Sequence, residues 1–372
     1  MFKIMTVFGT RPDALKMAPV VAELMKYQDR VRVLVAVTAQ HREMLDQVLR
    51  IFHIKPDYDL DIMLPRQTLT QVATRALLGL EPVLVKEQPD LVLVQGDTLT
   101  TFAASLAAFY QQIGVGHVEA GLRTDDKYNP FPEEINRRLT TQLADLHFAP
   151  TERARQELLG DGIRAEDIFV TGNTVIDALM ATAQRPFAFT EPPLANVRFE
   201  GRRTILVTAH RRENWGEPIR SICLAVRDIV AEFPDTRAIF QMHKNPVVRD
   251  VIQQELEGTA RILLIEPQEY VPWVHLMKRA YLVLTDSGGI QEEAPSLGVP
   301  VLVMRETTER PEGVDAGVAR LVGADRERIV AEARALLSDP ARYRAMAHAV
   351  NPYGDGHASE RIREAIFSRF RV

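Results

Sequence analysis

The sequence predicts an α/β protein built from two doubly wound parallel sheets. Short apolar runs that suit buried strands alternate with amphipathic helical segments along the chain. This pattern is typical of parallel sheets with right-handed crossovers. About ten such strands are expected, too many for one compact sheet. The chain has 372 residues, enough for about two domains. A proline-rich stretch without clear periodicity, 184–201, separates two groups of strands.

The expected strands fall into two groups of equal size. Those of the first group are Lys3–Phe8, Val31–Thr38, Leu91–Gln95, Val115–Glu119 and Leu146–Ala149. Those of the second group are Thr204–Thr208, Ala238–Met242, Ile262–Leu264, Leu282–Thr285 and Val299–Met304. Each group predicts a Rossmann-like domain. Two such domains facing each other would place the carboxyl ends of both sheets on one central cleft.

We expect the domain boundary to fall after Phe169, because a loop is expected around that position. The chain closes with a glycine-rich turn and a helix at Glu360–Phe367, which can cross back onto the first domain. The first domain is therefore expected to contain 1–169 plus 355–372, and the second 170–354.

Composition narrows the classes of function. The formal charge of −5 gives no basic field for nucleic acid and no polybasic patch for a membrane surface. No apolar run approaches the length of a membrane span, and the first residues form too short a run for a signal peptide. Cys223 is the only cysteine, which excludes an intrachain disulfide and a cysteine cluster for a metal. We expect a cytoplasmic protein without a metal site.

A glycine turn after the fourth strand of the second group is the most informative stretch. Asp286 or Ser287 can cap the helix that follows, and Gly288 and Gly289 leave its first-turn amides uncovered at the positive end of the helix dipole. That arrangement would seat a phosphate. Glu292 and Glu293 lie one turn further in, where a carboxylate can accept hydrogen bonds from paired sugar hydroxyls. Phosphate plus ribose suggests a nucleotide, although an ordinary turn that uses glycine for its backbone angles explains the stretch equally well when taken alone.

The turn after the first strand carries cations. Gly9 makes the turn, Pro12 suits the first turn of a helix, and Arg11 and Lys16 lie close to the carboxyl end of the strand. These cations could meet a diphosphate, or they could be solvated helix charges. Neither this turn nor any other carries Gly-x-Gly-x-x-Gly or Gly-x-x-x-x-Gly-Lys-Ser/Thr. A nicotinamide cofactor and a P-loop kinase are both disfavoured, so no cofactor is expected.

Acidic side chains follow two successive strands of the first domain. Asp97 comes directly after one strand, and His117 and Glu119 end the next. A lone carboxylate at such a place is often a helix cap, but two from successive strands favour a shared site. Glu133 and Arg137 belong to the helix that follows, where they share a face. Judged alone, that helix is equally well explained as a salt-bridged surface helix.

The second domain repeats this pattern with basic residues. His210 ends its first strand and is followed by Arg211, and His243 follows the next strand. A histidine at such an edge can donate to a phosphate or act as an acid. Trp273 could lie against a base or fill the core, and the core is the more ordinary place for it.

Nine motifs spread over nearly the whole chain complete the pattern. They are Gly-Thr-Arg-Pro with Lys16, Thr-Ala-Gln-His-Arg-Glu-Met, Gly-Asp-Thr at 96–98, His-Val-Glu-Ala-Gly-Leu-Arg-Thr at 117–124, Pro-Glu-Glu with Asn136 and Arg137, Thr-Gly-Asn-Thr-Val-Ile-Asp at 171–177, His-Arg-Arg-Glu-Asn, Thr-Asp-Ser-Gly-Gly-Ile-Gln-Glu-Glu-Ala-Pro and Asn-Pro-Tyr-Gly-Asp-Gly. In content and order they resemble the non-hydrolysing bacterial UDP-N-acetylglucosamine 2-epimerases. The resemblance implies a two-domain glycosyltransferase-B-like fold, a homodimer, and interconversion of UDP-N-acetylglucosamine and UDP-N-acetylmannosamine for surface polysaccharide synthesis.

The resemblance also implies roles for individual residues. The UDP site would consist of Arg11, Lys16, His210, Ser287, Gly288, Gly289, Glu293 and Arg310. The acid and the base would be found among Asp97, Glu119 and Glu133, and further substrate contacts would come from Arg137 and Trp273. Some members carry a second, regulatory UDP-N-acetylglucosamine site, whose positions match Gln40, Arg66, Arg211 and His243.

The chemistry of inversion at C2 favours one mechanism. It requires removal of a proton that no neighbouring carbonyl acidifies, and the missing dinucleotide fingerprint argues against oxidation of an adjacent carbon. We therefore expect the bond between C1 and UDP to break while a carboxylate takes the C2 proton, which leaves UDP and 2-acetamidoglucal. Protonation on the opposite face and re-addition of UDP give the epimer. The cations and His210 would stabilise the departing diphosphate, which makes His210 a catalytic residue.

Other functions fit part of the pattern. A UDP-sugar glycosyltransferase of the same fold would explain the phosphate seat but does not need three acids. A hydrolysing epimerase would release free N-acetylmannosamine. A member of the same family acting on a UDP-2,3-diacetamido uronate would differ in its sugar pocket. A nucleotide-sugar sensor would not exchange the C2 hydrogen with solvent.

Overall fold

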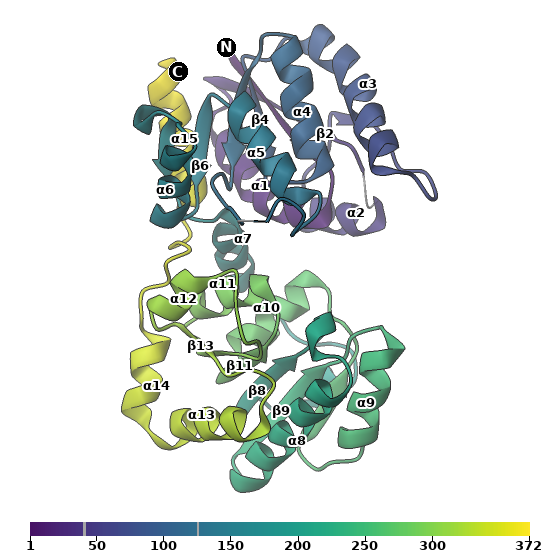
Figure 1. The fold of residues 1–372 in the computed structure, drawn as a ribbon, viewed down its shortest axis with the longest axis vertical. Helices are drawn as coiled ribbons and strands as arrows, with labels where there is room; N and C mark the ends of the chain where they lie inside the picture. Colours follow the sequence, from purple (N-terminus) through teal and green to yellow (C-terminus); the bar gives the residue numbers. More distant parts are fainter. Residues whose placement is uncertain (40–41, 125) are drawn as a thin grey trace. The chain divides into compact units, whose positions relative to one another are not determined.

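The chain divides into two compact units (Figure 1). The computed structural model of the protein describes residues 1–39, 42–124 and 126–372. The first unit contains Met1–Ala178 and Tyr353–Val372, and the second contains Leu179–Pro352. Both are α/β units with a parallel sheet, as the alternation of apolar strands and amphipathic helices predicted.

A seven-stranded parallel sheet forms the centre of the first unit, in the order β3-β2-β1-β4-β5-β6-β7. The strands are β1 (Phe2–Phe8), β2 (Val31–Val37), β3 (Tyr58–Asp59), β4 (Leu91–Gln95), β5 (Gly114–Val118), β6 (Leu146–Ala149) and β7 (Ile168–Val170). The five expected strands are present, and β3 and β7 are additional. These two lie at the edges and contain only two and three residues, too few to give a periodic signal in the sequence.

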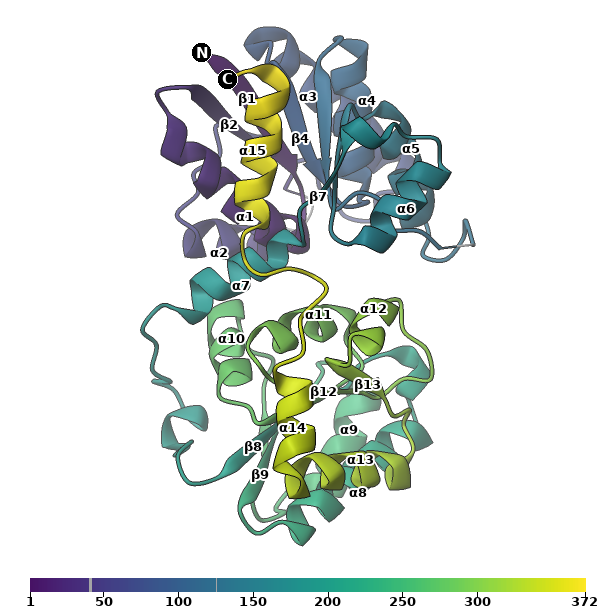
Figure 2. The same cartoon turned by 90° about the vertical axis from the view of Figure 1, so that its left-hand side faces the viewer.

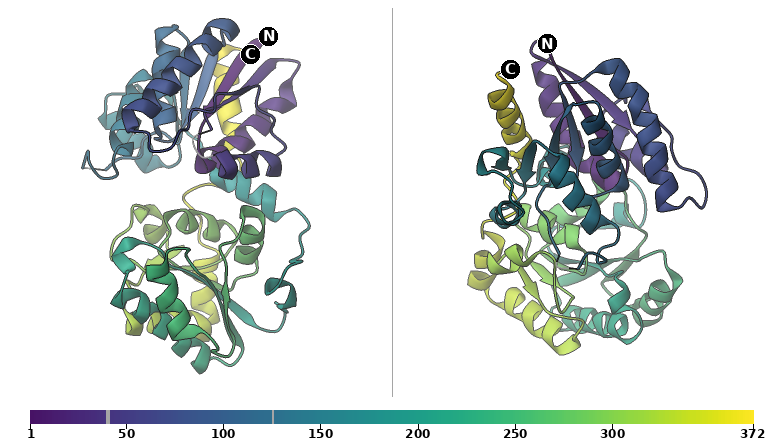
Figure 3. Two further views of the ribbon diagram at one scale, coloured as in Figure 1. Left: turned by 90° about the vertical axis from the view of Figure 1, so that its right-hand side faces the viewer. Right: turned by 45° about the horizontal axis from the view of Figure 1, so that its top comes forward.

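Helices cover both faces of this sheet (Figure 3). The helices of this unit are α1 (Arg11–Leu24), α2 (Arg42–Ile51), α3 (Leu69–Glu87), α4 (Leu99–Tyr110), α5 (Glu133–Leu143), α6 (Glu152–Gly160), α7 (Thr174–Ala183), whose last residues belong to the second unit, and α15 (Ala358–Phe370). Successive residues of β1 face opposite cores: Ile4 packs with Met17 of α1 and Ile366 of α15, whereas Met5 packs with Leu84 of α3. The burial of each such side chain contributes roughly 1.5–3 kcal/mol to the free energy of folding.

The first unit runs past Phe169, where the sequence analysis placed its end. The reason is that residues before and within α7 are bonded to the returning chain. The backbone N–H of Asn173 donates to the carbonyl of Tyr353 at 2.7 Å. Asp177 accepts from the first two amides of α15, at 3.1 and 2.7 Å. The side chain at the N-cap of α15, His357, makes no capping bond, so Asp177 supplies that cap from another helix. Figure 2 shows α15 beside α1.

The second unit contains a six-stranded parallel sheet in the order β10-β9-β8-β11-β12-β13. Its strands are β8 (Arg203–Thr208), β9 (Thr236–Gln241), β10 (Ile262–Ile265), β11 (Leu282–Thr285), β12 (Val301–Val303) and β13 (Ala319–Leu321). Its helices are α8 (Glu217–Glu232), α9 (Pro246–Leu256), α10 (Tyr270–Lys278), α11 (Gly288–Ser296), α12 (Pro311–Asp315), α13 (Arg326–Ser338) and α14 (Pro340–Ala347). Here the additional strand is β13, again short and at an edge.

The two sheets share one winding pattern. In each, the first strand lies between the second and the fourth, so the chain winds one way from the first strand and then the other way from the fourth. In such sheets the loops on either side of that reversal diverge, and the crevice beside the carboxyl ends of the two central strands binds ligands. The places to examine are therefore the ends of β1 and β4, and of β8 and β11. No helix in the described ranges is long and apolar enough to cross a membrane.

Candidate functional site

At the reversal point of the first unit, the turn from β1 to α1 is compact. A side chain at Gly9 would place its Cβ 2.2 Å from the hydroxyl oxygen of Thr38, so only glycine fits there. Thr10 caps α1 and forms a capping box with Asp13. Burial raises the pKa of Asp13 to about 6, although the amides of Gly9 and Thr10 donate to it. This turn places Arg11 at the start of α1. Among the described residues, the guanidinium of Arg11 has no hydrogen-bond or ion-pair partner.

The carboxylate of Glu119 is held in place by several neighbouring side chains. It directly follows β5, is 8% exposed and has a φ of +63°, a left-handed conformation that costs free energy for a residue with a side chain. Lys16 Nζ lies 2.5 and 2.6 Å from its two oxygens. Asn173 Nδ2 donates to Oε1 at 3.0 Å, and Gln95 Nε2 donates to Oε2. The surrounding donors therefore over-determine a strained position, as is found at functional sites.

Asp97 lies at the end of β4, next to the network around Glu119. Arg137 of α5 pairs with its carboxylate at 2.5 Å, and Asn136 donates to its backbone carbonyl at 2.9 Å. Burial raises the pKa of Asp97, Arg137 opposes that rise, and the charge of Glu119 adds to it. Asp97 thus holds a proton more readily than an ordinary aspartate. The structure brings Asp97, Glu119, Lys16 and Arg137 into one electrostatic group.

Glu133 stands apart from that group. It is the first residue of α5, partly exposed, and within the described ranges it makes no hydrogen bond or ion pair. Its neighbour Glu134 is fully buried instead and pairs with Arg137 at 3.3 Å and with Arg138 at 2.6 Å. The charged helix predicted from the sequence therefore contains both a salt-bridged cluster and side chains that contact Asp97. One face carries Asn136 and Arg137 to Asp97, and its buried glutamate holds the arginines.

His117 has a structural place. It is fully buried in β5, and burial lowers its pKa to about 3, so it is neutral. Its Nε2 lies 2.7 Å from the carbonyl of Gly96 and donates to it. Gly96 has a φ of +69° and immediately precedes Asp97. His117 thereby stabilises the turn that carries Asp97, a role that a histidine inside an apolar strand does not reveal in sequence.

At the reversal point of the second unit, Asp286 is a functional residue that the sequence analysis treated only as a cap. Neither Asp286 nor Ser287 caps α11 with its side chain. The Asp286 carboxylate is fully buried and turns to the loop after β8. There Oδ2 accepts from the backbone amides of His210 and Arg211, each at 2.8 Å, and from Asn214 Nδ2 at 3.0 Å. Asp286 therefore fixes the loop that carries His210.

The imidazole of His210 is oriented by the same carboxylate. Its Nδ1 lies 3.3 Å from Asp286 Oδ1, and its ring stacks on that of His243 with 5.8 Å between centroids. Burial lowers the pKa of His210, Asp286 opposes this, and the charges of Arg211 and His243 support it. Nδ1 is the ring nitrogen beside Asp286, so Nε2 is the one on the other side of the ring.

The start of α11 is the place where the glycines predict uncovered helix amides, the proposed anion seat. Ser287 is the N-cap, and Gly288 is the first helical residue. A Cβ on Gly288 would lie 3.5 Å from the guanidinium carbon of Arg310, and one on Gly289 would lie 3.3 Å from Glu293 Oε1. At Gly288 a Cβ would make ordinary contact with Arg310, whereas at Gly289 it would crowd Glu293.

Arg310 is held beside this seat by Glu292, which the sequence analysis considered only as an acceptor for sugar hydroxyls. Its Nε donates at 2.7 Å to Glu292, whose side chain is 6% exposed. The backbone carbonyl of Glu292 accepts from Asn351 Nδ2 at 2.8 Å. A buried carboxylate on the seat's own helix thus aims a cation at the seat. The adjacent pair Glu292 and Glu293 in the sequence was the only signal of it.

The remaining predicted residues are distributed over both units. Trp273 lies on α10 and is buried, with the residue 9% exposed. Arg66 is exposed in the first unit, where it lines a pocket of about 360 Å³ at the start of α3. Arg211 and His243 adjoin His210 in the second unit. Gln40 lies outside the described residues.

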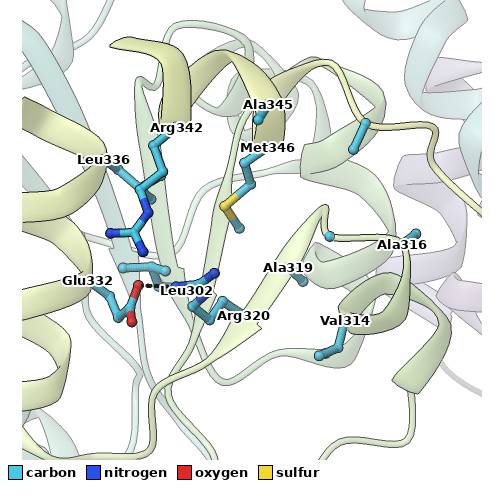
Figure 4. A pocket seen from close by; sticks show the side chains of 12 residues that line it. Leu302, Val314, Ala316, Ala319, Arg320, Glu332, Leu336, Arg342, Ala345 and Met346 are labelled. Atoms are coloured by element: carbon cyan, nitrogen blue, oxygen red, sulfur yellow. Dashed lines mark hydrogen bonds and ion pairs between the residues drawn. The ribbon is translucent and has the colours of Figure 1, made fainter. Parts of the chain in front are cut away.

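A further pocket of about 430 Å³ lies in the second unit between β13, α12, α13 and α14 (Figure 4). Its wall is mostly apolar, and Arg320 donates to Glu332 at 2.6 Å on one side. None of the predicted site residues lines it, so we assign it no part in the chemistry. Among the residues described, no cluster of three or more His, Cys, Asp or Glu could hold a metal ion.

Comparison with known proteins gives one consistent answer. A family model described as UDP-N-acetylglucosamine 2-epimerase matches residues 23–367. The UDP-N-acetylglucosamine 2-epimerase of Bacillus subtilis (strain 168) is 54% identical over 99% of this chain and 96% of its own length. The UDP-GlcNAc 2-epimerase from Neisseria meningitidis, in a crystal structure bound to UDP-GlcNAc, is 51% identical with a TM-score of 0.87 and covers 99% of this chain and 100% of its own.

Two further structures bear on the ligand and the fold. S. aureus MnaA, in a co-structure with UDP, is 51% identical with a TM-score of 0.85 over 100% of this chain and 97% of its own. The glycotransferase of kitacinnamycin is only 15% identical but has a TM-score of 0.66 over 100% of this chain and 99% of its own. That likeness shows the fold alone, a glycosyltransferase-B-like pair of Rossmann-like units.

Proposed function

Because the chain belongs to the UDP-N-acetylglucosamine 2-epimerase family, we propose that it interconverts UDP-N-acetylglucosamine and UDP-N-acetylmannosamine without hydrolysing them. The proposal assigns the sugar's proton chemistry to the first unit and the binding of UDP to the second. The proposal is supported by the different side chains at the two reversal points. The first has a group of carboxylates, and the second has the anion seat with a cation and a histidine.

The proposed reaction is an elimination followed by re-addition. The bond between C1 and the diphosphate oxygen breaks, and its electron pair leaves with UDP. A carboxylate takes the C2 proton, and the electrons of the C–H bond form the double bond of 2-acetamidoglucal. A proton then returns to C2 on the opposite face, and UDP adds again at C1. No oxidant or reductant is needed.

The observation that carries this mechanism is the adjacency of Asp97 and Glu119. One carboxylate that stays charged can accept a proton, and a neighbour whose pKa is raised can deliver one. The mechanism needs both functions, one on each face of the sugar. Glu133, which the structure leaves without a partner among the described residues, is retained as a third candidate because it begins the helix that carries Arg137.

In the second unit, the departing diphosphate would lie on the α11 amides. Arg310 and His210 Nε2 would approach its oxygens, and Arg11 and Lys16 of the first unit are the other cations proposed for it. Fixed donors of this kind need no reorganisation when charge develops on the leaving group.

Proton NMR in deuterated water tests the proposal. We expect UDP-N-acetylglucosamine alone to yield an equilibrium mixture with UDP-N-acetylmannosamine, and the C2 proton of both to be replaced by deuterium. Retention of the C2 proton in the product would overturn the elimination mechanism. Accumulation of free N-acetylmannosamine and UDP would instead identify a hydrolysing enzyme.

We also propose that the protein is a homodimer. This is supported by exposed apolar side chains on three neighbouring helices of the first unit, the apolar patch: Leu78 and Val85 of α3, Phe109 and Tyr110 of α4, and Ile135 and Leu139 of α5. These side chains are between 37% and 66% exposed. They offer on the order of 700 Å², close to what one partner buries in a standard interface. The same patch on a second copy would cover it about a two-fold axis.

Sedimentation velocity tests the dimer. Phe109→Glu should produce monomers at concentrations where the wild-type protein is dimeric. Tyr343, which stacks on Tyr281 in the second unit, is an aromatic residue outside the apolar patch, and Tyr343→Phe should leave the dimer intact. A monomeric wild-type protein would refute the proposal.

A further inference from the structure

We propose that Asn173 is a positioning residue for Glu119. It fixes the plane of that carboxylate from the segment of the first unit at which the chain leaves and returns. This inference rests on the proposed function, because it assumes that Glu119 takes part in proton transfer.

The direction of the Asn173 amide is fixed by its own contacts. Its Oδ1 accepts from the backbone amide of Val175 at 3.1 Å, so its Nδ2 must be the end that faces Glu119. The side chain is buried, with the residue 3% exposed. A donor that is oriented in this way has little freedom to follow a carboxylate that rotates, and it therefore selects one orientation of Glu119.

Asn173 supplies what Lys16 does not. Lys16 Nζ lies at nearly equal distances, 2.5 and 2.6 Å, from both Glu119 oxygens, so it supplies charge but does not distinguish one oxygen from the other. Asn173 bonds to Oε1 and Gln95 bonds to Oε2. These two amides define the plane of the carboxylate. Because the backbone of Glu119 is in a strained conformation, the side chain depends on such contacts to keep its place.

The backbone of Asn173 is tied to the returning chain. Its N–H donates to Tyr353 at 2.7 Å. A Cβ on Gly172 would lie only 3.3 Å from Gly354 Cα, so the two passages of the chain cross in close contact there. The first unit ends at 178 and resumes at 353. Asn173 therefore links Glu119 to both places at which the chain passes to the second unit.

The test compares Asn173→Asp with Asn173→Ala. The aspartate has the same shape but replaces a donor by an acceptor and places a negative charge beside Glu119. We expect kcat to fall by about tenfold to a hundredfold with little change in KM. The acid limb of the kcat profile should move to higher pH, because loss of a donor favours the protonated carboxylate. Asn173→Ala should show the same changes, but smaller. Asn196→Asp, on an exposed turn of the second unit, is the matched control.

The outcomes separate three cases. A wild-type protein without epimerase activity would reject the proposed function and leave the geometry of Asn173 as described. An active wild type whose Asn173 variants keep its kcat and pH profile would overturn the positioning role. If the loss of kcat only matches a loss of folded protein, measured by circular dichroism and active-site titration with UDP, the role is structural and the inference is likewise overturned. The shifted acid limb in folded protein supports it.

Discussion

The two units have the same strand order and use the same edge of the sheet, yet their polar groups are arranged in opposite ways. In the first unit, donors hold an acid: Lys16 and Asn173 surround Glu119. In the second unit, acids hold donors: Asp286 fixes the loop of His210, and Glu292 aims Arg310. The comparison teaches that this fold fixes where a site can lie but not the chemistry of that site. Under the proposed function, the charge that is buried and the charge that is presented decide whether the site handles protons or binds anions.

The largest effect is expected from removing an acid of the first unit. Asp97→Asn or Glu119→Gln should lower kcat by at least about a hundredfold, the usual scale for loss of acid or base catalysis. Steady-state conversion of UDP-N-acetylglucosamine measures it. Asp29→Asn, an exposed aspartate of the same unit, should leave kcat unchanged. Near-wild-type rates in both site variants would contradict the assignment.

Removing the cation of the second unit should affect binding. Arg310→Gln should weaken UDP binding by about tenfold to a hundredfold, because it loses charge-assisted hydrogen bonds to the diphosphate. Isothermal titration calorimetry measures this, and Arg342→Gln in the pocket of Figure 4 is the control. Asp97→Asn should bind UDP as the wild type does. Equal losses of affinity in both variants would remove the division of labour between the units.

The protonation of His210 gives a smaller effect, which depends on pH. In the free protein burial lowers the pKa of His210, so its imidazole is mostly neutral at pH 7.5. The charge of a bound diphosphate raises that pKa, and binding therefore takes up a proton. The affinity for UDP should fall as pH rises, by at most about tenfold per pH unit. Calorimetry in two buffers of different ionisation enthalpy should detect the proton uptake, and His210→Gln should abolish it. An unchanged proton uptake in that variant would exclude His210.

The smallest effect is expected for Trp273. Because this side chain is buried, Trp273→Phe should lower the melting temperature by a few degrees. The affinity for UDP should change by less than about threefold. Thermal unfolding and calorimetry on one preparation distinguish the two roles. A large loss of affinity without a change in melting temperature would restore Trp273 as a ligand of the base.

The ends of strands were predictable from sequence, and the contacts between them were not. An apolar run ends where a polar residue follows, so Asp97, Glu119 and His210 could be placed at the functional edge of a sheet. Periodicity also gave the central strands with their limits nearly correct. The edge strands β3, β7 and β13 are too short to leave a pattern.

The sequence could not reveal hydrogen-bond partners that are distant along the chain. Asp286 bonds to residues more than seventy positions away, and a residue before a glycine turn is more simply explained as a cap. His117 gave no sign that its ring supports a turn from a neighbouring strand. The domain boundary moved past Phe169 because Asp177 caps a helix 181 positions later in the chain. Such pairs form only once the fold brings them together.

Helix α15 has a consequence for how the protein is made. Its Ile362, Ile366 and Phe367 complete a core that otherwise consists of residues from the first half of the chain. A ribosome therefore synthesises the whole second unit while the earlier unit still exposes an apolar groove. The second unit can finish folding first, and the nascent amino-terminal half waits for the last helix. Chaperones that bind exposed apolar surface have their longest access to that half during translation.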